Sequence, residues 1–234
     1  MNAPIAPPMV PETPTRAMLA TLGIVASLCG LIIVLAYEGS LPAVQENRRI
    51  ALERAIHKVL PGAKAIVGLH APASGDIAKA PPGAEVPPGA IAFHAAYAAD
   101  GRLLGIAAEG SGKGYADAVR VLFGYVPACQ CVVGMSVVFM RETPGIGDKI
   151  LTDASFLASF RVLDARLAAE GGRLANEIRA VKHGTKTQPW QIDAIAGATI
   201  TSRAVGRAIN DTAQVLLPRV AKALPTLASH GKPQ

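Results

Sequence analysis

The pattern of apolar and polar positions begins with one long apolar run near the N-terminus. Residues 17–37 contain no charged side chain. As a helix this run is about 31 Å long, close to the thickness of the hydrocarbon core of a bilayer. We therefore predict a transmembrane helix at residues 16–38. The preceding residues, 1–15, are rich in Pro and Ala and are predicted to form a disordered tail.

A cleaved signal peptide is the alternative interpretation of the same run. Residues 34–36, Val-Leu-Ala, resemble a small-residue cleavage site. The run is longer than the core of about 7–15 residues that signal peptides use, so we favour an uncleaved anchor. Both interpretations place the rest of the chain across the membrane. Charge does not fix the orientation, because Arg16 precedes the run while Arg48 and Arg49 follow it.

Short apolar stretches in the middle of the chain predict an antiparallel sheet. Asp100-Gly101 separates two of them and is typical of a hairpin turn. Residues 127–130 join two others in a second predicted hairpin. The apolar residues are nearly continuous, which indicates strands covered on both faces. The predicted strands are residues 90–98, 102–110, 117–126 and 131–140.

Apolar residues at a spacing of three to four predict helices on both sides of this sheet. The first is a juxtamembrane helix within residues 39–65, which Pro61-Gly62 stops. The second covers residues 153–167. The third begins with Thr201 or Ser202 as its cap and is limited by Pro218.

The whole pattern predicts an α+β fold. The main domain is expected at residues 66–220, outside the bilayer, with a C-terminal tail at residues 221–234. Residues 71–90, which hold two Pro-Pro-Gly turns and no periodicity, are expected to form a surface loop.

Composition and motifs exclude several classes of function. The formal net charge of +6 is scattered and only 4% of residues are aromatic, so we expect no nucleic-acid partner. The Gly-rich stretch at residues 109–116 does not match a P-loop, because Ala107 and Gly114 occupy two of its defining positions. The histidines are dispersed without metal-binding spacing, so we predict no metal site, and no catalytic residue stands out.

The three cysteines do not form a disulfide framework. Cys29 lies in the apolar run, and Cys129 and Cys131 are two residues apart, so on a strand they would point the same way. A local disulfide and two buried thiols both fit this spacing. We favour buried thiols.

The segment DAIAGATITS, residues 193–202, places small residues just before the third predicted helix. Gly197 and Ala198 leave room for a bulky group to approach the backbone. The unpaired N–H groups and the positive dipole end of a helix start favour a phosphate, which a threonine could bond or carry covalently. The alternative is that Thr199 and Thr201 simply cap the helix. Physical arguments from these residues alone favour this alternative.

The same segment resembles the flavinylation motif of FMN-binding domains, Asp-x-x-(Ser/Thr)-Gly-Ala-Thr. In that family the last Thr holds FMN through a phosphoester made by a separate flavin transferase, and the resemblance places this linkage on Thr199. Ala196 departs from the motif, where the family has Ser or Thr, which puts one phosphate or transferase contact in doubt. The candidate cofactor residues in this segment are Asp193, Gly197, Ala198, Thr199 and Thr201.

A second segment, RETPGIGDKI at residues 141–150, resembles the Glu-Thr-Pro-Gly-Leu-Gly segment of the G subunit of the Rnf complex. A Pro-Gly-x-Gly turn lets the backbone pass close to a flat ring, on which Ile146 could pack. Thr143 would then bond the phosphate or the ring edge. The alternative is an ordinary turn. The candidate cofactor residues here are Glu142, Thr143, Gly145, Ile146 and Gly147.

Together the two motifs make roughly residues 15–220 similar to the Rnf G subunit. The resemblance implies a single-pass protein of the cytoplasmic (inner) membrane with an FMN domain on the periplasmic side. Its role would be electron transfer in a complex that couples ferredoxin–NAD electron flow to ion translocation. The expected partners are other membrane subunits and a flavin transferase, and the chain alone is not a complete enzyme.

Two other functions stay open. One is a flavinylated electron carrier of another system, such as the C subunit of the sodium-translocating NADH:quinone reductase, which shares the core of the second motif. The other is a membrane-anchored structural module without cofactor.

Overall fold

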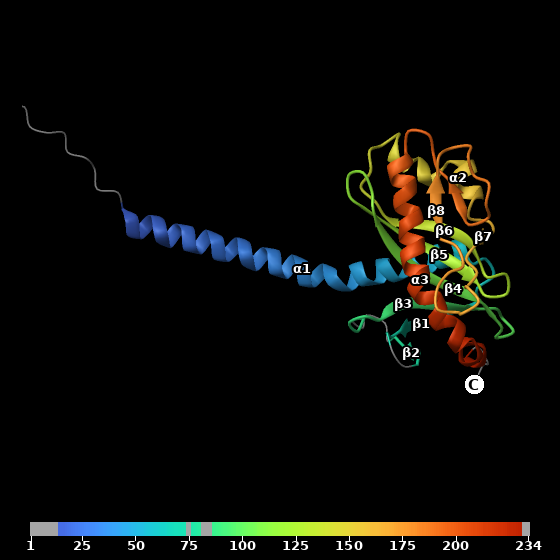
Figure 1. The fold of residues 1–234 in the computed structure, drawn as a ribbon. Helices are drawn as coiled ribbons and strands as arrows, with labels where there is room; N and C mark the ends of the chain where they lie inside the picture. The colour runs from blue at the N-terminus through green and yellow to red at the C-terminus, as the bar shows by residue number, and fades with distance from the viewer. Residues whose placement is uncertain (1–13, 74–75, 81–85, 231–234) are drawn as a thin grey trace, which may run out of the picture. The chain divides into compact units, whose positions relative to one another are not determined.

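The computed structural model describes residues 14–73, 76–80 and 86–230. The chain divides into two compact units, Met1–Ile50 and Ala51–Gln234, whose elements are labelled in Figure 1. Nearly all of the predicted N-terminal tail, and part of the predicted loop at residues 71–90, lie outside the described residues.

The described part of the first unit is helical. Helix α1 (Thr15–Val59) begins in this unit, and the large apolar side chains from Met18 to Tyr37 are exposed. Within the described part of the chain, α1 is the one helix long and apolar enough to cross a membrane. A helix that is apolar on all sides without a covering core suits a bilayer. The predicted transmembrane helix at residues 16–38 and the helix predicted within residues 39–65 belong to one helix, because α1 continues through Pro42.

The second unit contains a seven-stranded sheet in the order β2-β1-β3-β4-β5-β6-β7, and every pair of neighbours is antiparallel. Strands β8 and β9 form a separate parallel pair. The predicted α+β class is confirmed. The strands are β1 (Ala65–Ala71), β2 (Ala78–Lys79), β3 (Ile91–Tyr97), β4 (Leu103–Lys113), β5 (Ala118–Val126), β6 (Cys131–Phe139), β7 (Leu163–Asp164), β8 (Arg179–Val181) and β9 (Gln191–Asp193).

Both predicted hairpins are present. Gly101 takes a positive φ of 77° in the turn between β3 and β4, and residues 127–130 connect β5 to β6. The preference for two buried thiols is wrong, since Cys129 and Cys131 form a disulfide. Cys129 lies in the turn rather than on a strand. Gln130, with a φ of 49°, bends the chain so that the two Cα atoms are 5.2 Å apart.

The sheet is covered on both faces, as the nearly continuous apolar strands predict. Helix α3 (Thr199–His230) lies along one face, against β4 and β5 (Figure 1). On the other face, Ile56, Val59 and Leu60 pack against the alternate residues of β3, β4 and β5. In β4 the Gly-rich stretch permits close packing. A Cβ at Gly112 would lie 2.1 Å from the carbonyl oxygen of Ala204 in α3.

The helix predicted at residues 153–167 is wrong beyond its first turn. Helix α2 (Ala154–Ala158) is capped by Asp153, whose side chain accepts a hydrogen bond from the N–H of Phe156. The chain then leaves the helix, and the backbone N–H groups of Asp164 and Ala165 donate to Pro189 and Gln130. The apolar spacing therefore reflects burial of an irregular segment instead of a continuous helix.

Helix α3 also differs from its prediction at both ends. It begins at Thr199 and contains Pro218 and Pro225, so the expected end at Pro218 and the tail at residues 221–234 are wrong up to His230. A proline removes one helical hydrogen bond. Burial of Leu217 and Val220 on either side of Pro218 offsets that loss. Residues 231–234 lie outside the described residues.

Candidate functional site

The start of α3 is built on a tight turn at residues 195–198. The N–H of Ala198 donates to the carbonyl of Ile195 at 3.0 Å, and Gly197 takes a φ of 82°. Ser202, fully buried, fastens this turn. Its hydroxyl donates to the carbonyl of Ala198 and accepts from the N–H of Ile195 at 3.1 Å. Ser202 therefore stabilises the turn that leads into the helix. The prediction that Ser202 could cap the helix is wrong.

The two threonines of this segment have different environments. Thr201 is 2% exposed, and its hydroxyl donates to Oε2 of Glu142 at 3.0 Å. Thr199 is half-buried, and its hydroxyl bonds to no other group in the described part of the chain. Thr199 is therefore the accessible hydroxyl at the helix start. The prediction that Thr201 could cap the helix is wrong, since its hydroxyl bonds a distant loop.

The second motif forms an exposed turn followed by a short 3₁₀ helix, η1 (Gly147–Leu151). The N–H groups of Ile146 and Gly147 donate to the carbonyl of Thr143. Gly145 has a φ of 76°, the conformation that the third position of a type II turn requires. Ile146 is 51% exposed, which leaves its side chain free to contact a ligand.

Glu142 joins the two motifs, which lie far apart in the sequence. While Oε2 accepts from Thr201, Oε1 accepts from the N–H of Tyr115 at 2.9 Å. A Cβ at Gly114 or at Gly147 would overlap the Glu142 side chain, so both glycines make room for it. Both carboxylate oxygens are thus engaged by the protein. Glu142 positions the turn against the helix start, and the sequence could not reveal this partnership.

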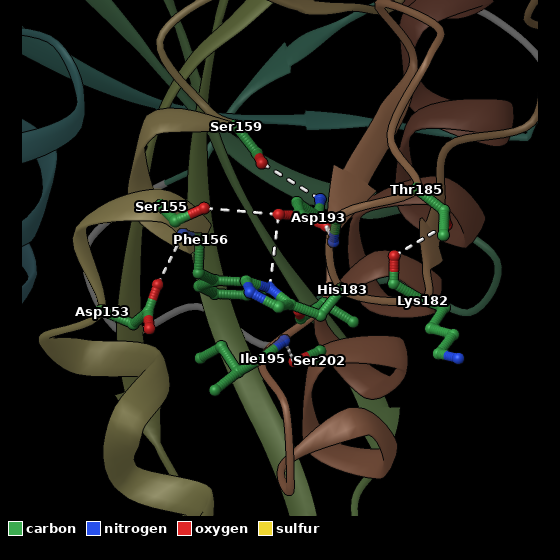
Figure 2. A network of polar contacts seen from close by, with 12 residues as sticks. Asp153, Ser155, Phe156, Ser159, Lys182, His183, Thr185, Asp193, Ile195 and Ser202 are labelled. Atoms are coloured by element: carbon green, nitrogen blue, oxygen red, sulfur yellow. Dashed lines mark hydrogen bonds and ion pairs between the residues drawn. The ribbon is translucent and has the colours of Figure 1, made fainter.

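Asp193 is also held by the protein (Figure 2). Its Oδ1 accepts from the N–H of Gly184 at 2.7 Å, and its Oδ2 accepts from the hydroxyl of Ser155 at 3.3 Å. Nδ1 of His183 lies 3.4 Å from the same Oδ2. The backbone N–H of Asp193 donates to Ser159. Asp193 therefore fastens β9, which leads into the turn before Thr199, to α2 and to the loop after β8.

A polar hollow of about 460 Å³ opens beside Asp193. Ser155, Ser159, Lys186 and Thr187 contribute to its lining. Sequence reasoning missed these residues and His183, because they come from two separate segments and match no short motif.

The residues at the start of α3 fit the phosphate and ring of FMN. Apart from the two chain neighbours of each glycine, no protein atom of the described residues lies within 4 Å of the position that a Cβ would take at Gly145 or Gly197, so both backbones are open to a ligand. Ile146 and Ile200 present exposed apolar side chains, as a flat aromatic ring requires. The N–H groups in the first turn of a helix have no helical acceptor and favour a phosphate.

Comparison with known proteins agrees with this geometry. Residues 114–214 match the sequence model of the FMN-binding domain. The chain is 36% identical over 104 residues to the G subunit of the ion-translocating oxidoreductase complex of Pasteurella multocida, a match that covers 44% of this chain and 46% of that protein.

A second relative is the G subunit of the Na(+)-translocating ferredoxin:NAD(+) oxidoreductase complex of Acetobacterium woodii, 33% identical over 106 residues. That match covers 45% of each protein. The matched region of the chain therefore spans somewhat less than half the length of each of these curated relatives.

Solved structures show the same fold. The crystal structure of NqrC from Shewanella oneidensis superposes with a TM-score of 0.60 at 21% identity, over 79% of this chain and 99% of that one. The C subunit of the Na(+)-translocating NADH-quinone reductase from Parabacteroides distasonis gives a TM-score of 0.59 at 17% identity, over 79% and 97%. Residues 114–214 are therefore similar in sequence to the FMN-binding domain, and the expected similarity of the chain to the G subunit of Rnf-type ion-translocating oxidoreductase complexes is confirmed.

Proposed function

We propose that this chain carries FMN covalently on Thr199, through a phosphoester, and transfers electrons as a subunit of an Rnf-type ion-translocating membrane complex. The observation that carries the proposal is the contrast between the two threonines. Thr201 is buried and bonded to Glu142, whereas Thr199, the first residue of α3, is only half-buried and its hydroxyl has no bonding partner among the described residues. A modifying enzyme can reach only an accessible hydroxyl.

The residues around Thr199 would bind and orient the cofactor. The first turn of α3 offers N–H groups and the positive end of the helix dipole to the phosphate. The exposed side chains of Ile146 and Ile200 offer apolar contact to the ring. Glu142 would keep these two elements in a fixed relation. Bound FMN supplies reversible electron transfer, and a covalent link retains it.

The membrane role rests on α1 and on the relatives. α1 can span a bilayer, and the matched relatives are subunits of translocating complexes by name. The partners we propose are other membrane subunits of such a complex and a flavin transferase that attaches FMN. We place the FMN domain on the extracytoplasmic side. The Cys129–Cys131 disulfide supports that side, because disulfides persist in oxidising compartments.

The attachment is tested by in-gel fluorescence of the full chain coexpressed with a flavin transferase. The wild-type band should fluoresce under ultraviolet light after denaturation, and the band of Thr199→Ala should be dark. Thr201→Val is the matched control, because it removes the neighbouring hydroxyl, and its band should still fluoresce. A fluorescent Thr199→Ala band, or a dark wild-type band, would refute the proposed attachment.

The electron-transfer role needs a separate measurement in membranes that contain the whole complex. Reduced ferredoxin should bleach the flavin absorbance of the wild-type chain, and the same signal should be missing with Thr199→Ala. Wild-type flavin that stays oxidised under these conditions would contradict the proposed role while leaving the attachment intact.

A further inference from the structure

The turn between β5 and β6 holds a disulfide whose two ends differ in accessibility. Cys129 is exposed, and Cys131, the first residue of β6, is 2% exposed. Between them Gln130 is the one residue other than glycine with a positive φ in the described part of the chain. Nothing in the FMN site uses this pair.

Backbone hydrogen bonds also hold the turn that carries the disulfide. The N–H of Gln130 donates to the carbonyl of Pro127 at 3.2 Å, and its carbonyl accepts from the N–H of Ala165 at 3.0 Å. The β5–β6 ladder also pairs Val126 with Cys131. With the sulfurs joined, the two Cα atoms of this turn lie 5.2 Å apart. A cross-link between residues only two apart also closes a very short loop and so adds little stability.

From this geometry we propose that Cys129 and Cys131 form an exchangeable disulfide, a second redox site that accepts two electrons from a dithiol. An exposed disulfide that contributes little to stability is more easily reduced than one that cross-links a core. After reduction, the turn would hold the two thiols close together, ready to form the same bond again.

The exchange runs in two steps, starting at the exposed sulfur. A thiolate of the dithiol attacks Sγ of Cys129, the bond to Cys131 breaks, and Cys131 leaves as a thiolate that takes up a proton. The second thiolate of the dithiol then attacks the other sulfur of the dithiol, which is bonded to Cys129 in the mixed disulfide. Cys129 is released, takes up a proton and becomes a thiol. The dithiol becomes a disulfide, and two electrons and two protons have moved to the protein.

This site is separate from the FMN site. Gly114 and Glu142 lie beside the start of β5, since the N–H of Gly114 donates to Asp117, whereas the disulfide follows its end. Eight residue steps along β5 correspond to about 26 Å. The exchange therefore does not depend on attached flavin.

The experiment uses the full chain with Cys29→Ser, in detergent, so that every thiol comes from the pair. Dithiothreitol is added without denaturant, the reaction is stopped with a maleimide, and labels are counted by intact mass. We expect no label before reduction and two labels after it. Far-ultraviolet circular dichroism and the unfolding midpoint should show a folded domain. Removal of dithiothreitol and addition of oxidised glutathione should restore the unlabelled mass.

Single variants test the order of attack in the same background. Cys131→Ser leaves the exposed Cys129 thiol, and Cys129→Ser leaves the buried Cys131 thiol. We expect the first variant to react with the maleimide at least about tenfold faster, because access controls thiol reactivity. The proposal is overturned if the disulfide resists dithiothreitol until denaturant is added, or if its reduction unfolds the domain. Equal rates for the two variants would overturn attack at Cys129.

Discussion

Replacement of Glu142 by Ala tests the link between the two motifs. The substitution removes the acceptor of the Thr201 hydroxyl and that of the Tyr115 N–H. The Thr201 hydroxyl is buried and would be left without a partner, which costs about 1–3 kcal/mol. Tyr115 is 72% exposed, so water can replace the bond to its N–H, at a net loss of about 0.5–1.5 kcal/mol.

The expected loss in the free energy of unfolding for Glu142→Ala is therefore about 1.5–4.5 kcal/mol, the sum of these two contributions. For a domain of this size that corresponds to a fall in Tm of about 3–18 °C. Glu142→Gln is the matched control. Its amide can still accept from Tyr115 and can donate to the Thr201 oxygen, so it should lose about 1 kcal/mol or less.

The assay is urea unfolding of the full chain in detergent, followed by the fluorescence of Trp190, the single tryptophan. A double-mutant cycle of Glu142→Ala with Thr201→Val isolates the contact, and its coupling energy should be about 1–2 kcal/mol. The account is refuted if the stability losses of Glu142→Ala and Thr201→Val simply add in the double mutant, or if Glu142→Gln loses as much stability as Glu142→Ala. Either result would mean that Glu142 does not hold the turn to the helix start.

Three further predictions concern packing, titration and the ring contact. Gly112→Ala should destabilise the domain by about 1–3 kcal/mol or more in urea unfolding, because its Cβ would overlap the backbone of Ala204; an unchanged midpoint would contradict this packing. Burial lowers the pKa of His94, with Glu109 opposing the shift, so the unfolded chain binds a proton that the folded chain resists. Stability should fall as the pH drops below about 6.5, and His94→Gln should flatten that fall; parallel curves for the two proteins would contradict it. Ile146→Asp should lower the midpoint potential of the attached flavin, by about 30 mV for each 1.4 kcal/mol of repulsion in a two-electron couple; an unchanged potential in potentiometric titration would mean that Ile146 does not face the ring.

Short sequence patterns predicted the parts of the fold that depend mainly on interactions between residues close together in the chain. Asp100-Gly101 can form its tight turn with few other contacts, and the hairpin is where it was expected. The uncharged run at residues 17–37 likewise predicts a membrane-spanning helix by itself, since its length and composition suit a bilayer. The third helix was also expected in this region, although α3 begins at Thr199, before the predicted caps Thr201 and Ser202.

Contacts between distant segments decided what the sequence could not predict. The apolar spacing after Asp153 resembles a helix, yet backbone bonds to Gln130 and Pro189 hold that segment in an irregular path. Pro218 normally ends a helix, but the buried side chains around it continue α3. The predicted contact of Glu142 with the cofactor stays a prediction, whereas its bond to Thr201, 59 residues away, shows a positioning role that the sequence could not reveal.

The measurement that tests the central claim most directly is fragmentation mass spectrometry of the tryptic peptide at residues 187–203. This peptide contains both Thr199 and Thr201. In the chain matured with a flavin transferase, the peptide should be heavier by one FMN minus one water, and the fragment ions should locate the added mass on Thr199. An unmodified peptide, or an added mass located on Thr201, would contradict the account.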